Sequence, residues 1–266
     1  MITTSAQRDS FEHDGFIVIP GLFTAAEIAA LKSEMSHLET TSMVAAAAGK
    51  DKGAMMVEDA RTPRLQFDIH TLGPRFEALS RHPRLAGIMQ DLMGTSLGIL
   101  HSKLAFKAAF TGSVQFWHQD FGYWVGDGYP RPDMASCLVM LDEHTEDNAC
   151  LQVLAGSHRD GVVTHERLTV ESTGNTQLRI SAEDMAGYCA RYARVKLIGA
   201  PGTFAAWHSN TMHASSHNVS EKSRNAAIFA FNAVSNAAKG SLASSAPTGH
   251  AEMKPVILSE EKSLLA

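Results

Sequence analysis

Residues 98–118, GILHSKLAFKAAFTGSVQFWH, decide the fold class of this 266-residue chain. They contain two β-prone runs, Gly98–Phe110 and Val114–His118, on either side of a break at Gly112. Short apolar and aromatic runs bounded by turn-forming residues are typical of β-strands. We therefore expect a β-rich region to begin at about Leu97.

The same pattern of short β-prone runs continues toward the C-terminus, where Gly, Pro, Asn and Asp separate one run from the next. These runs are Ala135–Leu141, Cys150–Leu154, Arg194–Ile198, Thr203–Trp207 and Ala226–Val234. Helices first and many short strands later favour an antiparallel double-sheet core with a helical flank. We expect one domain over residues 1–266: a helical flank over about 1–96, the core over about 97–236 and a tail over about 237–266.

The first part of the chain predicts one strand and three helices. Gly15–Pro20 is a β-rich run closed by proline, which suggests an edge strand. Thr24 and Glu27 form a capping box before Ile28, Leu31, Met35 and Leu38, whose helical spacing predicts an amphipathic helix of about four turns. Further helices are predicted over Pro74–Ser80 and Pro83–Met93.

Two segments fit neither pattern. Thr41–Asp59 is rich in Ala, Gly and Met with weak periodicity, so we expect a mobile loop or a frayed helix. Asp160–Gly187 interrupts the rhythm of strands and suggests an insertion across one face. Both segments are candidates for a lid over a pocket.

The bulk composition excludes several classes of partner. The formal net charge is −5 with no cluster of Lys and Arg, which argues against nucleic acid. No apolar run approaches the roughly 20 residues that cross a bilayer, so we expect no membrane partner. Three cysteines without a CxxC motif favour the reduced cytoplasm. A homodimer is a weak expectation.

The first chemical motif is Phe116-Trp-His118-Gln-Asp120-Phe121. On a strand alternate side chains share a face, so His118 and Asp120 are expected to point the same way. An imidazole and a carboxylate on one face make up two thirds of the 2-His-1-carboxylate triad that holds iron(II). The triplet alone is weak, because the chain has 13 histidines and matches by chance are expected.

The second motif lies 95 residues further on, where His213 is followed after eleven residues by Arg224. An arginine at the start of a buried strand can bind a carboxylate through two parallel hydrogen bonds. The plainer alternative is a strand-end arginine paired with Glu221. Together the elements predict an iron site with His213 as third ligand; His101, His208 and His217 are the alternatives for that position.

These motifs resemble the phytanoyl-CoA dioxygenase-like family of iron(II)/2-oxoglutarate oxygenases. The resemblance runs from Asp14-Gly-Phe-Ile-Val-Ile-Pro-Gly21 to about Asn232. It implies a double-stranded β-helix (jelly-roll or cupin-like) core, with His118, Asp120 and His213 as iron ligands. It also implies that Arg224 binds the distal carboxylate of 2-oxoglutarate. By position, Lys103, on the strand before the motif at His118, and Ser215, two residues beyond His213, are further candidate contacts to co-substrate or substrate; plain structural roles are the alternative.

Within that family, residues 117–124, 127–131 and 153–159 are similar to the ectoine hydroxylase signature. The chain departs from that signature at Gln115, Gln119, Gly122 and Ile228, two of which replace aromatic residues. The resemblance therefore implies the chemistry rather than the substrate. Candidate substrate contacts are Gln115, Trp124, His101 and Ile228.

The implied activity is hydroxylation of an unactivated C–H bond in a small polar metabolite, such as an amino acid or an ectoine-like derivative. The implied cofactors are Fe(II), 2-oxoglutarate as co-substrate, and O₂. Asp120 favours hydroxylation over halogenation, because related halogenases have Ala or Gly there. The alternatives are the same chemistry on a natural product or phosphonate, a cupin-like metal enzyme without 2-oxoglutarate, and a non-catalytic sensor.

Overall fold

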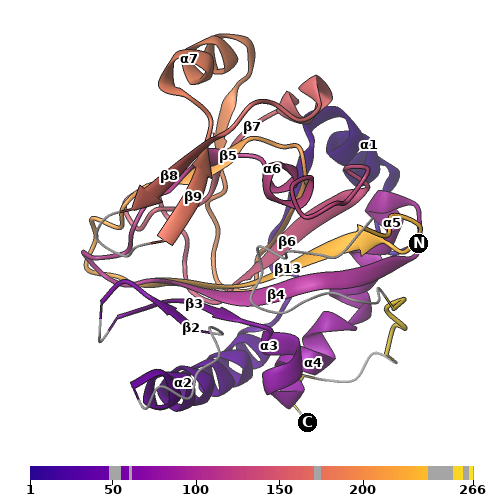
Figure 1. Ribbon diagram of the computed structural model, residues 1–266. Helices are drawn as coiled ribbons and strands as arrows, with labels where there is room; N and C mark the ends of the chain where they lie inside the picture. The colour runs from indigo at the N-terminus through magenta and orange to yellow at the C-terminus, as the bar shows by residue number, and fades with distance from the viewer. Residues whose placement is uncertain (48–54, 60–61, 171–174, 239–253, 260–263, 266) are drawn as a thin grey trace.

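Two antiparallel β-sheets form the centre of the fold, one above the other in Figure 1. The computed structural model describes residues 1–47, 55–59, 62–170, 175–238, 254–259 and 264–265. Within these residues the larger sheet has the strand order β1-β11-β6-β13-β4-β3-β2 and the smaller one the order β10-β7-β12-β5. The predicted class, mainly β with flanking helices around a jelly-roll core, is confirmed.

The strands are β1 (Phe16–Ile19), β2 (Met55–Val57), β3 (Pro63–Phe67), β4 (Leu97–Lys107), β5 (Gln115–His118), β6 (Met134–Met140), β7 (Gln152–Leu154), β8 (Glu166–Val170), β9 (Asn175–Arg179), β10 (Arg194–Lys196), β11 (Phe204–His208), β12 (His213–Ser215) and β13 (Arg224–Ala233). The helices are α1 (Ser5–Asp14), α2 (Ala25–Ala47), α3 (Ile69–Leu72), α4 (Pro74–Ser80), α5 (Ile88–Met93), α6 (Asp120–Trp124) and α7 (Ala182–Arg191). A π-helical turn (Pro83–Gly87) precedes α5, and a 3₁₀ turn (Ser157–Asp160) follows β7.

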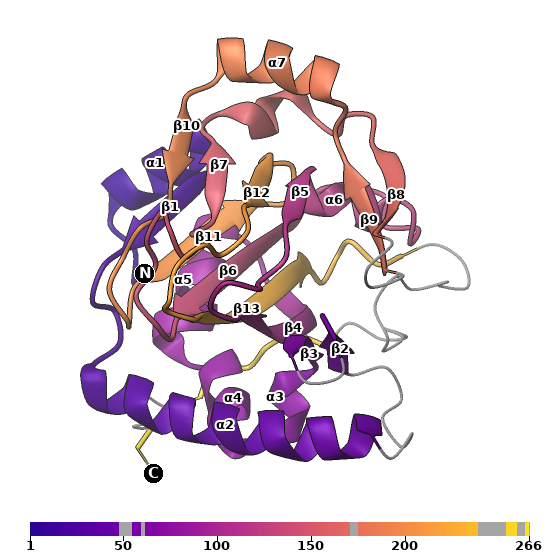
Figure 2. The same ribbon diagram turned by 90° about the vertical axis from the view of Figure 1, so that its left-hand side faces the viewer.

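The larger sheet is covered on both faces, as the sequence of its central strand β6 already shows. Every residue from Met134 to Met140 is buried. Cys137 and Val139 pack toward the helices, whereas Leu138 and Met140 pack into the space between the sheets. Helices α2, α3 and α4 lie along the outer face of this sheet in Figures 1 and 2. The inner face of the larger sheet therefore forms one wall of the space between the two sheets.

Helix α2 begins with the predicted capping box. The backbone N–H of Thr24 donates to Glu27 Oε2 over 2.9 Å, and the Glu27 N–H donates to Thr24 Oγ1 over 3.3 Å. The four residues of the expected apolar face, Ile28, Leu31, Met35 and Leu38, are all buried. No helix in the part of the chain described above is both long and apolar enough to span a membrane.

For Thr41–Asp59 we expected a mobile loop or a frayed helix, and the first part is helical. Helix α2 continues to Ala47, because Ala45–Ala47 are strong helix formers. The Thr40 and Thr41 hydroxyls donate to the carbonyls of Ser36 and His37, one turn earlier. Met55–Val57 form the edge strand β2. Residues 48–54 lie outside the described residues.

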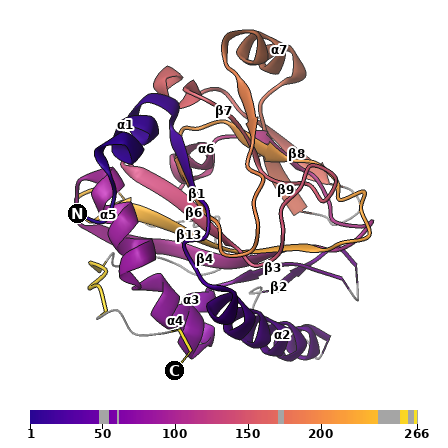
Figure 3. The same cartoon turned by 180° about the vertical axis from the view of Figure 1, so that it is seen from behind.

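The expected insertion over Asp160–Gly187 contains the hairpin of β8 and β9 and most of α7, which lies at the top of Figure 3 with the hairpin below it. It is attached to β5, the edge strand of the smaller sheet: the N–H of Ile180 donates to the carbonyl of Trp117 over 2.8 Å. Residues 171–174 of this segment lie outside the described part. Whether either segment acts as a lid stays a prediction.

The core gives a direct test of the layered packing. Phe229 on β13 is completely buried between the larger sheet and its helices. We expect Phe229→Ala to lower the free energy of unfolding by about 3–5 kcal/mol in urea denaturation. Phe110→Ala, at an exposed phenylalanine, is the matched control and should change it by less than about 0.5 kcal/mol. Equal costs for the two variants would contradict this packing.

The capping box gives a pH-dependent test. Burial works to raise the pKa of Glu27, but hydrogen bonds from Arg84 and Thr24 and the Arg84 charge outweigh it and lower that pKa to about 2. Because the folded pKa is depressed, the stabilisation is complete above the unfolded value and is lost as pH falls from about 4.5 toward 2. We expect Glu27→Gln to be destabilising at pH 7 and the gap to wild type to narrow at pH 3. Glu77→Gln, at an exposed ion pair, is the control.

Candidate metal centre

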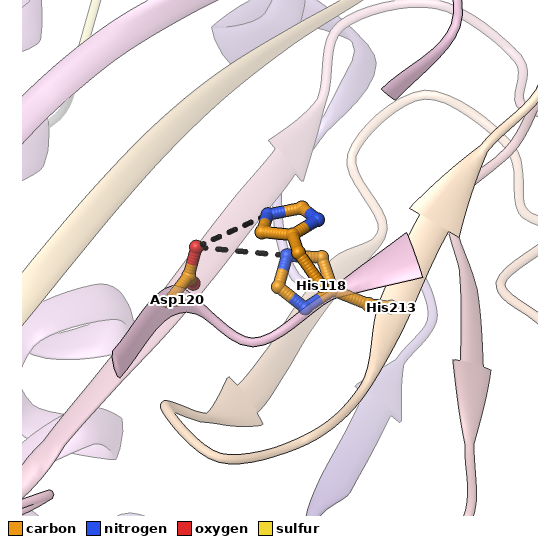
Figure 4. A group of neighbouring side chains, drawn as sticks. All are labelled: His118, Asp120 and His213. Atoms are coloured by element: carbon orange, nitrogen blue, oxygen red, sulfur yellow. Dashed lines mark ion pairs between the residues drawn. The ribbon is translucent and has the colours of Figure 1, made fainter. Parts of the chain in front are cut away.

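Three side chains from three elements converge in the space between the sheets (Figure 4). His118 is the last residue of β5, Asp120 the first of α6 and His213 the first of β12. One ligand atom from each residue lies within 4.8 Å of the other two. Asp120 Oδ1 is 3.7 Å from His118 Nε2 and 3.6 Å from His213 Nε2.

Strand pairing brings the two histidines together across 95 residues of sequence. Strands β5 and β12 are antiparallel neighbours, and His213 lies directly opposite His118. The two ring centroids are 4.2 Å apart.

Asp120 was expected on the same strand as His118, and that expectation is wrong: β5 ends at His118 and Asp120 begins α6. Gln119 between them is extended, with φ −112° and ψ 137°. The side-chain alternation of the strand thus continues for one more step, and Asp120 still points to the side of His118.

Hydrogen bonds orient all three side chains. The Nδ1 atoms of His118 and His213 lie 2.7 and 2.9 Å from the carbonyls of Phe116 and Thr211. Each Nδ1 therefore donates its proton to a carbonyl, and each Nε2 presents a lone pair to the centre. Asp120 Oδ2 accepts from the Ser136 hydroxyl over 2.7 Å and from Trp207 Nε1 over 3.0 Å, which turns Oδ1 toward the imidazoles.

The electrostatics keep His213 and Asp120 in the protonation states that a metal requires. Burial, with a smaller contribution from the neighbouring His118, lowers the pKa of His213 to about 4, so its ring is neutral at pH 7. Burial opposes ionisation of Asp120, yet the histidines and Lys103 hold its pKa well below the ordinary value. A neutral imidazole pair and a carboxylate anion are the donor set of the 2-His-1-carboxylate triad.

The spacing of these atoms fits a metal ion better than direct hydrogen bonds. Separations of 3.6 and 3.7 Å are too long for hydrogen bonds. Ligand atoms that each lie about 2.0–2.2 Å from one ion are separated from one another by roughly 3–4 Å. His118, Asp120 and His213 therefore have the chemistry and the spacing to hold iron(II) on one face.

The triad lines a cavity of about 280 Å³ between the sheets. All ten residues that the sequence singled out for the site line it: His101, Lys103, Gln115, His118, Asp120, Trp124, His213, Ser215, Arg224 and Ile228. Their individual roles stay predictions, but the structure brings all of them to one place.

Arg224 is the first residue of β13, and its side chain is buried, with 4% exposure. Its Nε has no hydrogen-bond partner among the described residues, and no described carboxylate lies within ion-pair distance of it. The pairing with Glu221 is thus not formed in this part of the chain. A buried guanidinium without an anion is costly, so its position in the wall of the cavity suits a ligand carboxylate.

Basic side chains gather around Arg224. Lys107 lies opposite it on β4 and donates to the carbonyls of Ser113 and Ser216. Burial and the charges of Arg224 and Arg64 lower the pKa of Lys107 to about 6. Lys103 also faces the cavity from β4, opposite Ile228, and burial lowers its pKa. This end of the cavity favours an anion.

The competing histidines do not join the triad. His217 is exposed, and His208 packs against His158 with ring centroids 5.4 Å apart. His101 lines the cavity but packs edge-on against Trp124, with centroids 6.0 Å apart. The described metal-ligand cluster contains His213 as its second histidine.

The sequence missed several residues of the cavity wall. Ser136 and Trp207 orient Asp120, and Arg64, Tyr123 and Gln177 line the same cavity. Tyr123 lies within the quoted motif region, but Arg64 and Gln177 come from a short strand and an insertion that carry no motif. Only the tertiary contacts reveal them.

The contacts to Asp120 generate a test. Trp207→Phe removes the indole donor and keeps an aromatic ring, so the orientation of Asp120 is weakened. We expect anaerobic Fe(II) or Mn(II) affinity, measured by titration calorimetry, to fall by roughly 10–100-fold. Trp117→Phe, at a half-buried tryptophan that packs in a separate cluster, is the matched control and should bind metal as wild type does. An unchanged affinity in Trp207→Phe would show that this hydrogen bond does not support the centre.

Comparison with known proteins gives the same picture. The family model for phytanoyl-CoA dioxygenase (PhyH) matches residues 11–226. An ectoine dioxygenase of Sphingopyxis alaskensis is 32% identical over 240 residues, which cover 88% of this chain and 77% of that protein. An ectoine dioxygenase of Stutzerimonas stutzeri is 29% identical over 260 residues, covering 96% and 83%.

Solved structures match over a similar extent. The crystal structure of EctD from S. alaskensis with 2-oxoglutarate and 5-hydroxyectoine has a TM-score of 0.77 and 30% identity, covering 99% of this chain and 86% of that one. The carbocyclase SnoK from nogalamycin biosynthesis shares the fold, with a TM-score of 0.69, 17% identity, and coverage of 88% and 85%. The match of the family model over most of the chain shows that this protein belongs to the phytanoyl-CoA dioxygenase (PhyH) family.

Proposed function

We propose that this protein is an Fe(II)- and 2-oxoglutarate-dependent dioxygenase that hydroxylates an unactivated C–H bond of a small polar metabolite of the ectoine type. The observation that supports it best is the buried Arg224, which forms no ion pair among the described residues and lies in the wall of the cavity that the His118–Asp120–His213 triad lines. The ectoine dioxygenases among its relatives, and the EctD structure with 2-oxoglutarate, support the same chemistry.

His118, Asp120 and His213 would hold the iron. The bound iron, together with 2-oxoglutarate and O₂, supplies the oxidising power for C–H hydroxylation, with release of succinate and CO₂. The protein contributes geometry: the backbone carbonyls and Trp207 hold the three ligands on one side, and the rest of the cavity is left to co-substrate and substrate.

Arg224 would bind the distal carboxylate of 2-oxoglutarate. Its planar guanidinium can donate two parallel hydrogen bonds, and burial makes each of them stronger than at a surface. Ser215, buried and opposite Gln115 in the β5–β12 pair, and Lys103 are the further contacts that we propose for this end.

The size of the cavity limits the substrate. About 280 Å³ lies just below the roughly 300–1,000 Å³ of small-molecule sites, and the co-substrate must share this volume. A small metabolite fits this limit better than an acyl-CoA thioester. Gln115, Trp124, His101 and Ile228 are the substrate contacts that we propose.

The buried Cys137 and Cys150 are free thiols, in keeping with a reduced cytoplasm.

The function is tested at Arg224. Wild-type protein with anaerobic Fe(II) and 2-oxoglutarate should show a weak visible metal-to-ligand charge-transfer band, and ectoine-like metabolites should stimulate succinate formation. We expect Arg224→Ala to raise the KM for 2-oxoglutarate by at least about 30-fold, because the co-substrate carboxylate loses a buried charged partner.

Arg224→Lys is the matched variant, since it keeps the charge and loses the two parallel hydrogen bonds. Its KM for 2-oxoglutarate should lie between those of wild type and Arg224→Ala. A wild-type protein that shows no band and forms no succinate with any small metabolite would contradict the oxygenase and favour a binding module. Succinate formation with an unchanged KM in Arg224→Ala would reject the role of Arg224 alone.

A further inference from the structure

A second buried guanidinium lines the cavity, and the iron and co-substrate contacts proposed above do not use it. Arg64 on β3 has only 7% exposure. Its Nη1 has no hydrogen-bond partner among the described residues. Its Nη2 makes one long hydrogen bond, 3.4 Å, to the carbonyl of Val114.

The carboxylate near Arg64 does not satisfy it. Glu58 Oε1 is 3.9 Å from Arg64 Nε, beyond hydrogen-bond distance, and the same oxygen accepts the Ser113 N–H over 3.0 Å. Gln177 Nε2 donates to the Val114 carbonyl over 3.2 Å and so shares the acceptor of Nη2. Arg64 therefore has donors left over in a buried position, where unmade hydrogen bonds to a charged group are expensive.

Arg64 is separate from the anion site at Arg224. Arg224 lies on β13 and Arg64 on β3, and β4 runs between them in the larger sheet. Two strand spacings correspond to roughly 10 Å between the backbones. The two arginines therefore enter the cavity from different strands, on either side of β4.

Tyr123 connects Arg64 to the metal centre. Its ring packs edge-on against His118, with ring centroids 5.6 Å apart. Tyr123 and Arg64 both line the cavity. The Tyr123 oxygen accepts the Leu178 N–H over 2.8 Å, which fixes the position of this hydroxyl in the cavity wall.

We propose that Arg64 binds a carboxylate group of the substrate, so that the substrates are small carboxylic acids such as amino acids and their cyclic derivatives. This inference rests on the proposed function. The carboxylate would lie against Arg64 and Tyr123, and the C–H bond to be hydroxylated would face the ligand atoms of His118 and Asp120.

The first experiment compares matched probes. Ectoine, L-proline and L-pipecolate, each paired with its neutral carboxamide, are offered to the Fe(II)- and 2-oxoglutarate-loaded protein, and succinate formation is measured. We expect at least one carboxylate to stimulate succinate formation and its carboxamide to do so at least about tenfold less, because the charged hydrogen bonds to Arg64 are lost.

The second experiment removes the guanidinium. Arg64→Gln should raise the KM for the active carboxylate at least about tenfold and abolish the preference over the carboxamide. The KM for 2-oxoglutarate and the visible band should stay within twofold of wild type, which a general loss of structure would not allow. Arg64→Lys should recover part of the preference. Arg81→Gln, at an exposed ion pair just after the end of α4, is the matched arginine control.

The outcomes separate the two proposals. A normal visible band with equal responses to carboxylate and carboxamide, or with no response to any carboxylate, would overturn the role of Arg64 alone. An increase in the KM for 2-oxoglutarate in Arg64→Gln would assign Arg64 to the co-substrate and overturn it as well. A wild-type protein without the band would overturn the proposed function and this inference with it.

Discussion

The antiparallel pairing of β5 with β12 is the constraint on which the site depends. It places His213 directly opposite His118, so that two residues far apart in sequence become cross-strand neighbours. A shift of this register by one residue would turn one imidazole to the other face of the sheet. The geometry of the metal centre therefore depends on the register of β5 and β12 as well as on the two histidines.

The larger sheet contributes the charges that face this centre. Lys103, Lys107 and Arg224 project from β4 and β13, which are neighbours over ten residue pairs from Arg224–Lys107 to Ala233–Leu97. The outer face of the same strands packs against the helices. A small cavity lined by these basic side chains, beside a 2-His-1-carboxylate triad, suits two small acids at once.

The sequence predicted the residues of the site better than the elements that carry them. The β-rich core and the triad could be predicted because strand texture and the motif at His118 and Asp120 are local, and Arg224 begins an apolar run. The first helix, α1, was missed although Thr4 and Gln7 form its capping box. Asp120 was placed on a strand because the sequence does not show that β5 ends at His118. Gln119 is a single extended residue after that strand, and its residue type does not distinguish it from a residue within a longer strand.

Arg64 and Gln177 could not be found from the sequence. Each lies on a short strand, and each reaches the cavity only because β3 joins the larger sheet and β9 joins the insertion beside β5. Both side chains meet at the carbonyl of Val114. Contacts of this kind form only in the folded protein, and no periodicity or motif spacing in the sequence indicates them.

The Nδ1 contacts of the two histidines have a consequence for the evolution of such a centre. In each case the acceptor is a main-chain carbonyl two residues earlier, at Phe116 and at Thr211. A side-chain acceptor can be lost through one codon change, whereas a peptide carbonyl is present whatever residue occupies the position. The tautomer of both imidazoles is thereby protected against mutation, and the surrounding wall is free to diverge toward new substrates while the chemistry persists.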